Sequence, residues 1–476
     1  MTPEEFRTAG HRLIDWIADY RARLAAGELP VKSPLPPGAV AAGIPASAPP
    51  EGEPIERIFA DFTGTMLPGI THWQHPSFFG YFPANAALSS VLGDILSSGL
   101  GVIGLNWQAS PALTELETAM MQWMRDLVGL SSAWSGVLQD TASTATLIAL
   151  ICARERSTGH GGAHGGLQAA GRPLVVYASD QAHSSVEKAA VLAGFGRDHV
   201  RAIPTDSSFA LSVEALEAAL EDDLRRGLMP CCVVATTGTT GTTAMDPIDA
   251  IVRIAHRKGL WVHVDSAMAG AGMLLPELRH HWSGIEGADS IVLNAHKWLG
   301  AVFDCSLYFV RDPDHLIRVM STNPSYLRSA VDSEVINYRD WGIPLGRRFR
   351  ALKLWFLLRA EGTERLRERL RRDLANARWL AGQVARSREW TVVAPVELQT
   401  VCVRHAPAGL EGDALDAHTQ AWCARLNSSG AAYLTPARIA GRWTVRVSIG
   451  AELTERIHVE SLWERMQSAV RTGVPM

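Results

Sequence analysis

The chain has 476 residues, of which 47% are hydrophobic and 20% are charged, and its formal net charge at pH 7 is −4. This balance is typical of a globular protein, and the length predicts roughly two to three domains. The small net charge argues against a nucleic-acid partner. Because the first residues are acidic with no apolar segment behind them, and no apolar run reaches about 18 residues, we expect a cytoplasmic protein without a signal peptide or membrane span.

Cysteine usage is also typical of a reducing compartment. No two cysteines form a C-x-x-C pair, and most lie in apolar runs, so we expect reduced core thiols rather than disulfides or a zinc site. The histidines of the Gly-rich stretch 157–166 have no acidic or thiol ligands beside them. We interpret this stretch as a flexible surface loop and expect no metal site. The six cysteines are Cys152, Cys231, Cys232, Cys305, Cys402 and Cys423.

The N-terminal segment predicts a helix followed by a connector. Thr2 is a suitable N-cap, Pro3 suits the first helical position, and Glu4 and Glu5 place carboxylates in the first turn. The Pro/Gly/Ala-rich stretch 30–54 predicts an extended connector. We assign residues 1–85 to this helical segment.

From about residue 86 the chain alternates between short apolar runs and helical stretches. Such alternation predicts an α/β fold with a mostly parallel sheet covered on both faces, in a large domain at 86–355. A charged helical stretch at 350–386 and a final helix at 454–470 indicate a small α+β domain at 356–476. Expected strands are 174–177, 200–203, 231–235, 260–264, 290–293, 306–310, 391–394 and 443–449.

Two residues with complementary chemistry follow neighbouring predicted strands. Lys297 comes shortly after the run 290–293, with His296 directly before it, and Asp265 follows the run 260–264. In such sheets, ligands bind beyond the carboxyl ends of the strands. Pyridoxal phosphate (PLP) requires a lysine for a Schiff base and a carboxylate for its pyridine nitrogen. The two residues therefore predict a PLP site, whereas a dinucleotide-binding enzyme would need a Gly-rich turn after its first strand, and none is found there.

Other features supply the remaining parts of such a site. Thr141, Ala142 and Ser143 open a helical run, where backbone N–H groups can bind a phosphate. His183 follows the run 174–177 and can stack on a flat cofactor or transfer protons. A Thr-rich loop at 236–243 follows another predicted strand. Each feature alone is more typical of an ordinary cap or polar loop, and it is their combination with a lysine and a carboxylate at strand ends that favours a cofactor site.

Six motifs in this order resemble those of the group II PLP-dependent amino-acid decarboxylases, and specifically of the aromatic L-amino-acid decarboxylases. The resemblance extends from the N-terminal helix to at least residue 350 and more weakly to the end. It implies the aspartate-aminotransferase type of PLP-dependent transferase fold (fold type I) and PLP as the cofactor. The motifs are HPSFFGYFP at 75–83, NWQASPALTELE at 106–117, SDQAHSS at 179–185, HVDSAMAG at 263–270, NAHKWL at 294–299 and WGIPLGRRFR at 341–350.

The resemblance also implies roles for individual residues. Lys297 matches the Schiff-base lysine, Asp265 the partner of the pyridine nitrogen, and His183 and Ala267 the residues on the two faces of the ring. Tyr326 matches a loop tyrosine implicated in protonating the substrate carbon after CO2 leaves. Relatives with Phe there tend to form aldehydes, so Tyr326 favours an amine product. The other matching cofactor positions are Thr141, Ala142, Ser143, Thr240, Asp246, Asn294 and His296.

The matching substrate pocket is apolar and flat, which suits an aromatic ring. Leu105 stands where animal relatives have Phe, and Ala84 where they have Thr, so the pocket is roomier and less polar. In plant relatives, Gly at the position of Gly346 tends to accompany indolic substrates. We therefore expect tryptophan or 5-hydroxytryptophan as favoured substrates, with phenylalanine, tyrosine and L-DOPA also accepted. The matching pocket positions are Trp73, Tyr81, Phe82, Pro83, Ile103, Leu105 and Gly346.

The resemblance implies a homodimer with shared active sites, embraced by the N-terminal segment, and no nucleic-acid or membrane partner. Ser266 and Met268 replace residues that are frequently Ala and Tyr in the family, and Ala295 replaces Pro. Alternative activities on the same fold are an aromatic aldehyde synthase and a histidine decarboxylase. A catalytically idle PLP-binding protein is disfavoured, because the lysine, the aspartate and the loop tyrosine are all present.

Overall fold

The computed structural model describes residues 1–166, 171–322 and 331–471. The chain forms two compact units. Unit 1 comprises residues 1–83, 372–393 and 399–476, and unit 2 comprises residues 84–371 and 394–398. Within the described ranges, no helix combines the length and apolar composition needed to cross a membrane.

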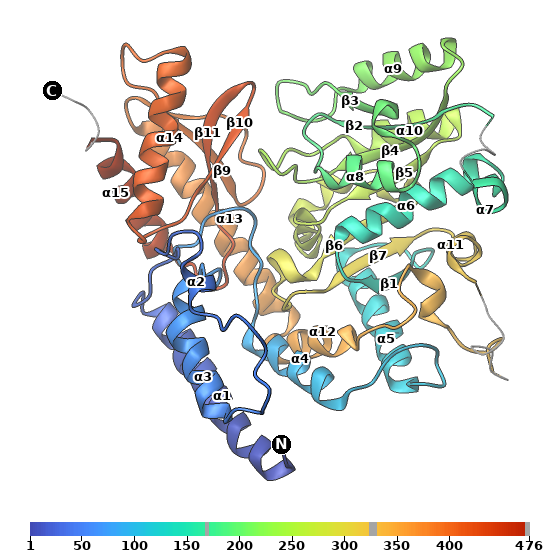
Figure 1. Ribbon diagram of the computed structural model, residues 1–476. Helices are drawn as coiled ribbons and strands as arrows, with labels where there is room; N and C mark the ends of the chain where they lie inside the picture. The colour runs from blue at the N-terminus through green and yellow to red at the C-terminus, as the bar shows by residue number, and fades with distance from the viewer. Residues whose placement is uncertain (167–170, 323–330, 472–476) are drawn as a thin grey trace. The chain divides into compact units, whose positions relative to one another are not determined.

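The centre of unit 2 is a seven-stranded sheet in the order β1-β7-β6-β5-β4-β2-β3 (Figure 1). Only β7 runs against its neighbours, and the other strands are mutually parallel. All residues of β2, β5, β6 and β7 are buried, as expected of strands covered on both faces. The strands are β1 (Ser135–Gln139), β2 (Leu174–Ser179), β3 (Val200–Ile203), β4 (Met229–Thr236), β5 (Trp261–Asp265), β6 (Ser290–Asn294) and β7 (Ser306–Val310).

Helices between the strands pack on this sheet. Helix α6 packs against α8 and against β4, β5 and β6, whereas α9 and α10 pack against β4 and against each other (Figure 1). The helices are α4 (Leu88–Leu100), α5 (Pro111–Val128), α6 (Ala142–Ser157), α7 (Gly161–Gly165), α8 (Ser185–Leu192), α9 (Val213–Arg225), α10 (Ile248–Lys258), α11 (Pro313–Met320) and α12 (Arg350–Glu361).

Helix α10 illustrates how the sequence specifies these elements. Its apolar residues recur at a helical period, and Ile248, Ile251 and Ala255 are buried against the sheet. Its last turn is basic, which complements the negative end of the helix dipole. Gly259 ends it with a φ of 70°, in the left-handed region that favours glycine. The chain then enters β5 directly.

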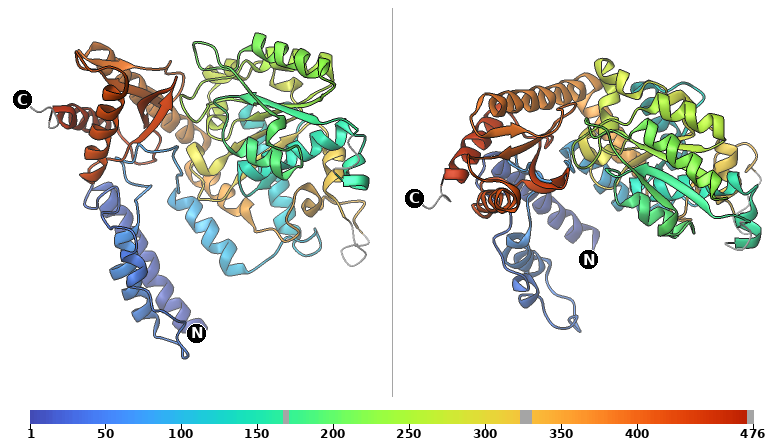
Figure 2. Two further views of the ribbon diagram at one scale, coloured as in Figure 1. Left: turned by 45° about the horizontal axis from the view of Figure 1, so that its top comes forward. Right: turned by 90° about the horizontal axis from the view of Figure 1, so that it is seen from above.

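Unit 1 combines the N-terminal helices with an antiparallel sheet in the order β10-β11-β9-β8. Helix α14 packs against β11 and α15 (Figure 2). Trp16 and Phe59 join α1 and α3 with their rings edge to face, 5.5 Å apart. The elements are α1 (Pro3–Ala25), α2 (Ala39–Ala42), α3 (Ile55–Asp61), β8 (Trp390–Val392), β9 (Thr400–His405), α14 (Gly412–Ser428), β10 (Thr435–Ile439), β11 (Arg442–Ser448) and α15 (Arg456–Arg471).

The predicted fold class is confirmed, and so is the N-terminal cap, where Thr2 and Glu5 form a reciprocal capping box. All six cysteines are free and buried. The helical stretch expected at 350–386 is confirmed; Gly362, with a φ of 72°, divides it into α12 and α13 (Thr363–Arg386). The connector at 30–54 and the loop at 157–166 each contain a short helix, α2 and α7, that the Gly- and Pro-rich composition had not indicated.

Candidate active site

The parallel strands of unit 2 bring the predicted cofactor residues to one edge of the sheet. Because β1, β6, β5, β4 and β2 run in the same direction, their carboxyl ends meet there. Lys297 follows β6, Asp265 ends β5 and His183 follows β2, while Thr141 follows β1. Ligands of open α/β sheets bind beyond this edge.

Lys297 lies in the segment Ala295–Leu299, directly after β6, at a kink where its backbone is not helical (φ −100°, ψ −115°). Its side chain is partly buried, and its backbone carbonyl accepts a hydrogen bond from Nδ2 of Asn85 at 3.2 Å. Burial lowers the pKa of the Lys297 amine, and the negative charge of Asp265 partly opposes that shift. A lowered pKa increases the fraction of neutral amine, which is the form that attacks an aldehyde.

Asp265 is almost fully buried at the end of β5. One carboxylate oxygen accepts the N–H of Ala267 at 3.0 Å. The Asp265 charge acts on both Lys297 and His183, so these three groups share one electrostatic environment. A buried carboxylate needs a cationic or hydrogen-bonding partner, and a protonated pyridine nitrogen provides both.

His183 lies at the same edge, where its side chain is accessible to solvent on one side and covered by protein on the other. Its Nδ1 accepts the backbone N–H of Ser185 at 3.1 Å, so in the neutral ring Nε2 carries the proton. Burial by the surrounding protein lowers the pKa of His183, Asp265 opposes this shift, and Lys297 adds to it. A neutral imidazole that presents Nε2–H can stack on an aromatic ring and donate a hydrogen bond.

His296 and Asn294 are held by the start of β7. Nδ1 of His296 accepts the N–H of Cys305 at 2.9 Å, and burial together with the charge of Lys297 lowers the pKa of His296 to about 4. The ring is therefore neutral with its proton on Nε2. Asn294 Oδ1 accepts the hydroxyl of Ser306, and Asn294 N–H donates to the carbonyl of Ala267 at 2.9 Å.

The amino end of α6 has the features of a phosphate site. Thr141 is the N-cap, and its hydroxyl accepts the N–H of Thr144 at 3.4 Å. Ala142 and Ser143 occupy the first turn, where backbone N–H groups have no partner within the helix. A 16-residue helix also directs the positive end of its dipole toward this turn.

The Thr-rich loop after β4 is anchored by a buried carboxylate. Asp246 accepts the N–H of Thr236 at 2.7 Å and that of Leu211 at 2.8 Å. Burial raises the pKa of Asp246 to about 7 despite these two hydrogen bonds. Thr240, in the same loop, has an exposed side chain. Asp246 therefore holds the loop that carries Thr240.

Two of the expected pocket segments of unit 2 meet. The N–H of Gly104 donates to the carbonyl of Arg347 at 2.9 Å, which brings Ile103 and Leu105 beside the turn containing Gly346. A Cβ placed on Gly346 would lie 3.4 Å from Cγ2 of Ile103. The absence of a side chain at this position therefore leaves space next to Ile103.

The other expected pocket residues belong to unit 1. The rings of Trp73 and Tyr81 are stacked with centroids 5.4 Å apart, and the guanidinium of Arg446 lies 5.0 Å from the ring of Phe82. Pro83 is buried. Tyr326 lies outside the residues that the structure describes.

Several residues that support the site were given no role by the sequence. Asn85 is 212 positions from its partner Lys297, and Ser306 bonds Asn294 across two paired strands, so neither single polar residue gives a local signal. Ser266 replaces the family's frequent Ala, and its hydroxyl contacts the Thr237 hydroxyl and accepts Nε1–H of Trp282 at 3.0 Å. The departure from the family pattern was the one available signal for Ser266.

The fold and the strand-end residues define the class of enzyme that holds PLP at the carboxyl edge of a mostly parallel sheet. The buried Asp265, the amine of Lys297 and the amino end of α6 fit the pyridine nitrogen, the aldehyde and the phosphate of that cofactor.

Comparisons with known proteins identify the same class of PLP-dependent enzyme. Residues 37–406 match the pyridoxal-dependent decarboxylase conserved domain. Tyrosine decarboxylase of Papaver somniferum and phenylacetaldehyde synthase of Arabidopsis thaliana are each 39% identical; the alignments cover 98% of this chain and 94% and 96% of those proteins. Tryptophan decarboxylase 2 of Oryza sativa subsp. japonica is 38% identical over 98% of this chain and 95% of its own.

Solved structures are similar over almost the whole chain. The Oryza sativa TDC structure with PLP and tryptamine matches with a TM-score of 0.95 and 35% identity, covering 99% of each chain. The structure of Catharanthus roseus tryptophan decarboxylase with L-tryptophan matches with a TM-score of 0.92 and 36% identity, again over 99% of each chain. The chain belongs to the pyridoxal-dependent decarboxylase family, among the aromatic amino acid decarboxylases, and is a carboxy-lyase with PLP as its cofactor.

Proposed function

We propose that this enzyme decarboxylates aromatic L-amino acids to the corresponding arylalkylamines and CO2, with tryptophan and 5-hydroxytryptophan favoured. The observation that carries the proposal is the pairing of Lys297 with the buried Asp265 at neighbouring strand ends. When bound, PLP accepts the electron pair left on the substrate carbon as CO2 departs. The family match supports this reaction over other PLP chemistry.

In this proposal each residue has a defined task. With PLP bound, the Lys297 amine would hold the cofactor aldehyde, and Asp265 would hold the pyridine nitrogen in its protonated form. His183 covers one face of the cofactor ring, and Ala267 packs on the other. Tyr326 donates a proton to the substrate carbon after CO2 has left. Thr141, Ala142, Ser143, Asn294 and His296 bind the phosphate, and Thr240 bonds the ring substituents.

The substrate preference rests on the size of the expected pocket. Gly346 leaves room beside Ile103, which suits the larger indole ring. The two solved tryptophan decarboxylase structures, one with tryptamine and one with L-tryptophan, are consistent with this choice. Comparison of kcat/KM for tryptophan, 5-hydroxytryptophan, phenylalanine, tyrosine and L-DOPA tests it. The highest value should belong to an indole substrate, and a strong preference for tyrosine or L-DOPA would refute the assignment.

A second candidate activity is aldehyde formation. Two of the similar proteins are a phenylacetaldehyde synthase and a 4-hydroxyphenylacetaldehyde synthase, at 39% and 34% identity. Aldehyde formation consumes O2 and water and releases ammonia and hydrogen peroxide as well as CO2. Tyr326 favours the amine instead, because it supplies the proton that the substrate carbon requires. Measurement of hydrogen peroxide release separates the two activities.

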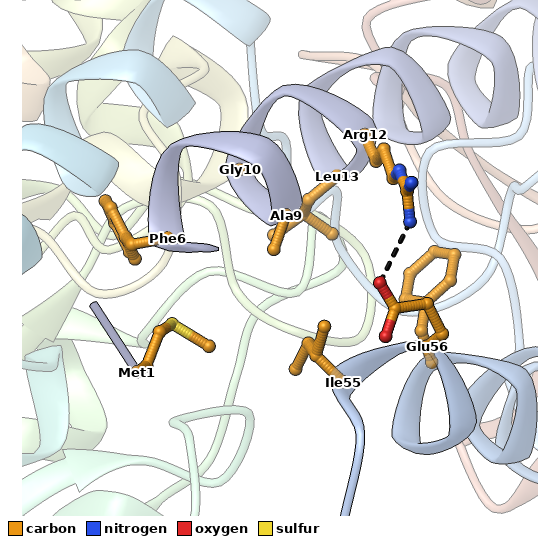
Figure 3. A pocket seen from close by; sticks show the side chains of 9 residues that line it. Met1, Phe6, Ala9, Gly10, Arg12, Leu13, Ile55 and Glu56 are labelled. Carbon is orange, nitrogen blue, oxygen red and sulfur yellow. Dashed lines mark hydrogen bonds and ion pairs between the residues drawn. The ribbon is translucent and has the colours of Figure 1, made fainter. Parts of the chain in front are cut away.

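We also propose that the enzyme works as a homodimer. Helix α4 exposes a row of large apolar side chains, including Leu92 and Leu96, and such a row is unusual on a surface that stays in water. In unit 1, α1 and α3 border an apolar cavity of about 330 Å³ with the Arg12–Glu56 ion pair at its rim (Figure 3). A second copy of the chain would cover such surfaces.

Sedimentation velocity tests the dimer. The wild-type protein should sediment at twice the chain mass, and Leu96→Glu should shift it toward the monomer. Leu192→Glu serves as the matched control, because Leu192 is a similarly exposed leucine on α8. A monomeric wild-type protein would exclude the proposed assembly.

A further inference from the structure

The segment after β6 that carries Lys297 is not a regular helix. Lys297 has non-helical backbone angles, with a φ of −100° and a ψ of −115°. A regular helix holds each residue through its own ladder of hydrogen bonds, so a residue at a kink depends on donors from elsewhere in the chain. The backbone of Lys297 is therefore positioned by the groups that bond the carbonyls around it.

Three consecutive carbonyls of this segment accept hydrogen bonds from two side chains that are distant in the sequence. Nδ2 of Asn85 donates to the carbonyl of Lys297 at 3.2 Å. Nη2 of Arg369, on α13, donates to the carbonyls of Trp298 and Leu299 at 2.9 and 2.5 Å. Asn85 is 1% exposed, so water does not compete for its hydrogen bond. We call Asn85 and Arg369 the carbonyl clamp.

Gly300 makes room for the clamp. Its φ is 108°, in the left-handed region that favours glycine. A Cβ at this position would lie 2.8 Å from Nη1 of Arg369, so any other side chain would displace the guanidinium. The guanidinium of Arg369 therefore packs directly against the backbone that follows Lys297.

The clamp lies beside the amine that is expected to react with the cofactor. Burial lowers the pKa of the Lys297 amine, which makes more of it neutral and nucleophilic, but a nucleophile must also lie about 3–3.5 Å from the atom that it attacks. A displacement of about 1 Å can slow such a reaction about 100-fold. The backbone contacts of this segment therefore bear on how fast Lys297 reacts.

We propose that Asn85 and Arg369 are positioning residues for Lys297. Arg369 has the larger effect, because it bonds two carbonyls through a charged donor, whereas Asn85 bonds one through a neutral amide. Both act through the backbone carbonyls of residues 297–299. The inference rests on the proposed role of Lys297 as the residue that holds PLP, and it deepens that role.

The test measures how fast Lys297 captures PLP. PLP is removed from the full-length protein and added back at saturating concentration, and stopped-flow absorbance follows the near-visible band of covalently bound PLP. In this step the amine nitrogen attacks the aldehyde carbon, and the aldehyde oxygen leaves as water. Arg369→Met, which keeps a long side chain without donors, should slow capture about ten- to 100-fold. Asn85→Ala should slow it about three- to tenfold, the effect of losing one neutral hydrogen bond.

Arg367→Met is the matched control on the same helix. Nε of Arg367 donates to the carbonyl of Leu274 at 2.9 Å, so this variant also loses a hydrogen bond between an arginine and a carbonyl. It should leave the capture rate within about twofold of the wild type. Arg369→Lys should restore most of the rate, because a single nitrogen supplies both hydrogen bonds of Arg369 and an ammonium group can donate both.

A capture rate unchanged in Arg369→Met would overturn the inference. Equal slowing in Arg369→Met and Arg367→Met would also overturn it, because the two arginines would then only anchor the helix. Circular dichroism shows whether each variant is folded. If Arg369→Met is unfolded, Asn85→Ala provides the test, and an unchanged capture rate in that variant would overturn the inference. A near-visible band that survives in Lys297→Ala would instead refute the role of Lys297 on which the proposed function depends.

Discussion

Arg347 binds Glu117 through two hydrogen bonds, of 2.9 and 2.6 Å, and both side chains are buried. Arg347 also donates to the carbonyl of Leu138 at 2.6 Å, and Glu117 accepts the N–H of Leu138 at 2.8 Å. The ion pair therefore joins three elements: α5, strand β1 that leads to the phosphate site, and the turn that carries Gly346. Because both charges are buried, each depends on the other for its solvation.

Replacing Arg347 should consequently destabilise the folded protein. Arg347→Met leaves the Glu117 carboxylate buried without its cation and should lower the free energy of unfolding by about 3–5 kcal/mol. The neighbouring Arg348→Met is the control, because Arg348 is exposed and its ion pair with Asp94 should contribute no more than about 1 kcal/mol. Urea unfolding measures the free energy of unfolding of both variants. Equal effects of the two substitutions would show that the buried pair adds nothing beyond a surface pair.

Lys297→Ala should remove the near-visible absorption band that arises when PLP is bound covalently to the enzyme. Decarboxylation should fall by at least about 10³-fold, because the nucleophile that exchanges cofactor between enzyme and substrate is lost. Lys258→Ala, at the exposed end of α10, should change neither property. Spectra of the purified proteins with added PLP provide the measurement, and a surviving covalent band in Lys297→Ala would exclude Lys297.

Asp246 should make stability depend on pH. Its pKa rises from an ordinary 3.8 to about 7 in the folded protein, so between these values the folded state binds a proton more readily than the unfolded state. Its contribution is therefore fully present below about pH 4 and is lost as the pH rises through about 7. The free energy of unfolding of the wild type minus that of Asp246→Asn should fall across this window and then level off. A difference that rises or stays constant would contradict the assignment.

Gly346→Ser should shift the enzyme from indolic toward phenolic substrates. The new side chain would enter the space next to Ile103, where a Cβ already makes van der Waals contact at 3.4 Å. The ratio of kcat/KM for tryptophan to that for tyrosine should fall about tenfold, the lower end of what a small change in pocket size achieves. Gly52→Ser is a matched control, because a Cβ there meets nothing within 4 Å. An unchanged ratio would mean that Gly346 does not border the substrate.

Tyr326→Phe should divert the product from amine to aldehyde. Without the phenol proton, the substrate carbon remains open to oxidation by O2, and hydrogen peroxide should accumulate with the aldehyde. Tyr338→Phe is the control: its phenol bonds Thr118 at 3.0 Å in the core, so that substitution should leave the product an amine. The amine, aldehyde and hydrogen peroxide formed by each variant under air should be measured. An unchanged amine yield from Tyr326→Phe would exclude Tyr326 as the required proton donor.

The parts of the fold that were predicted correctly are those with a strong local pattern. Strands β5 and β6 are mostly apolar, and the polar residues at or after their carboxyl ends reach one sheet edge by topology alone. By contrast, β1 contains only two strongly apolar residues, Val137 and Leu138, and is a strand because β7 pairs with it. A pattern that depends on a distant partner is not visible in a short window of sequence.

The supporting residues of the site were missed for the same reason. Arg347 and Glu117 are 230 positions apart, and Asn85 lies 212 positions from Lys297. Arg369 resembles any other arginine of a charged helix until the structure brings it to the carbonyls of Trp298 and Leu299. The sequence therefore predicted residues with distinctive chemistry at strand ends, whereas residues that hold them were found only by long-range contacts.

With PLP bound, we expect this site to convert aromatic amino acids to amines. The most direct test of this expectation is mass spectrometry of the products after the PLP-loaded protein is incubated with equal amounts of tryptophan, 5-hydroxytryptophan, phenylalanine, tyrosine, L-DOPA, histidine and glutamate. The expected products are arylalkylamines, led by tryptamine. Amines from histidine or glutamate alone, or aldehydes with hydrogen peroxide, would contradict it.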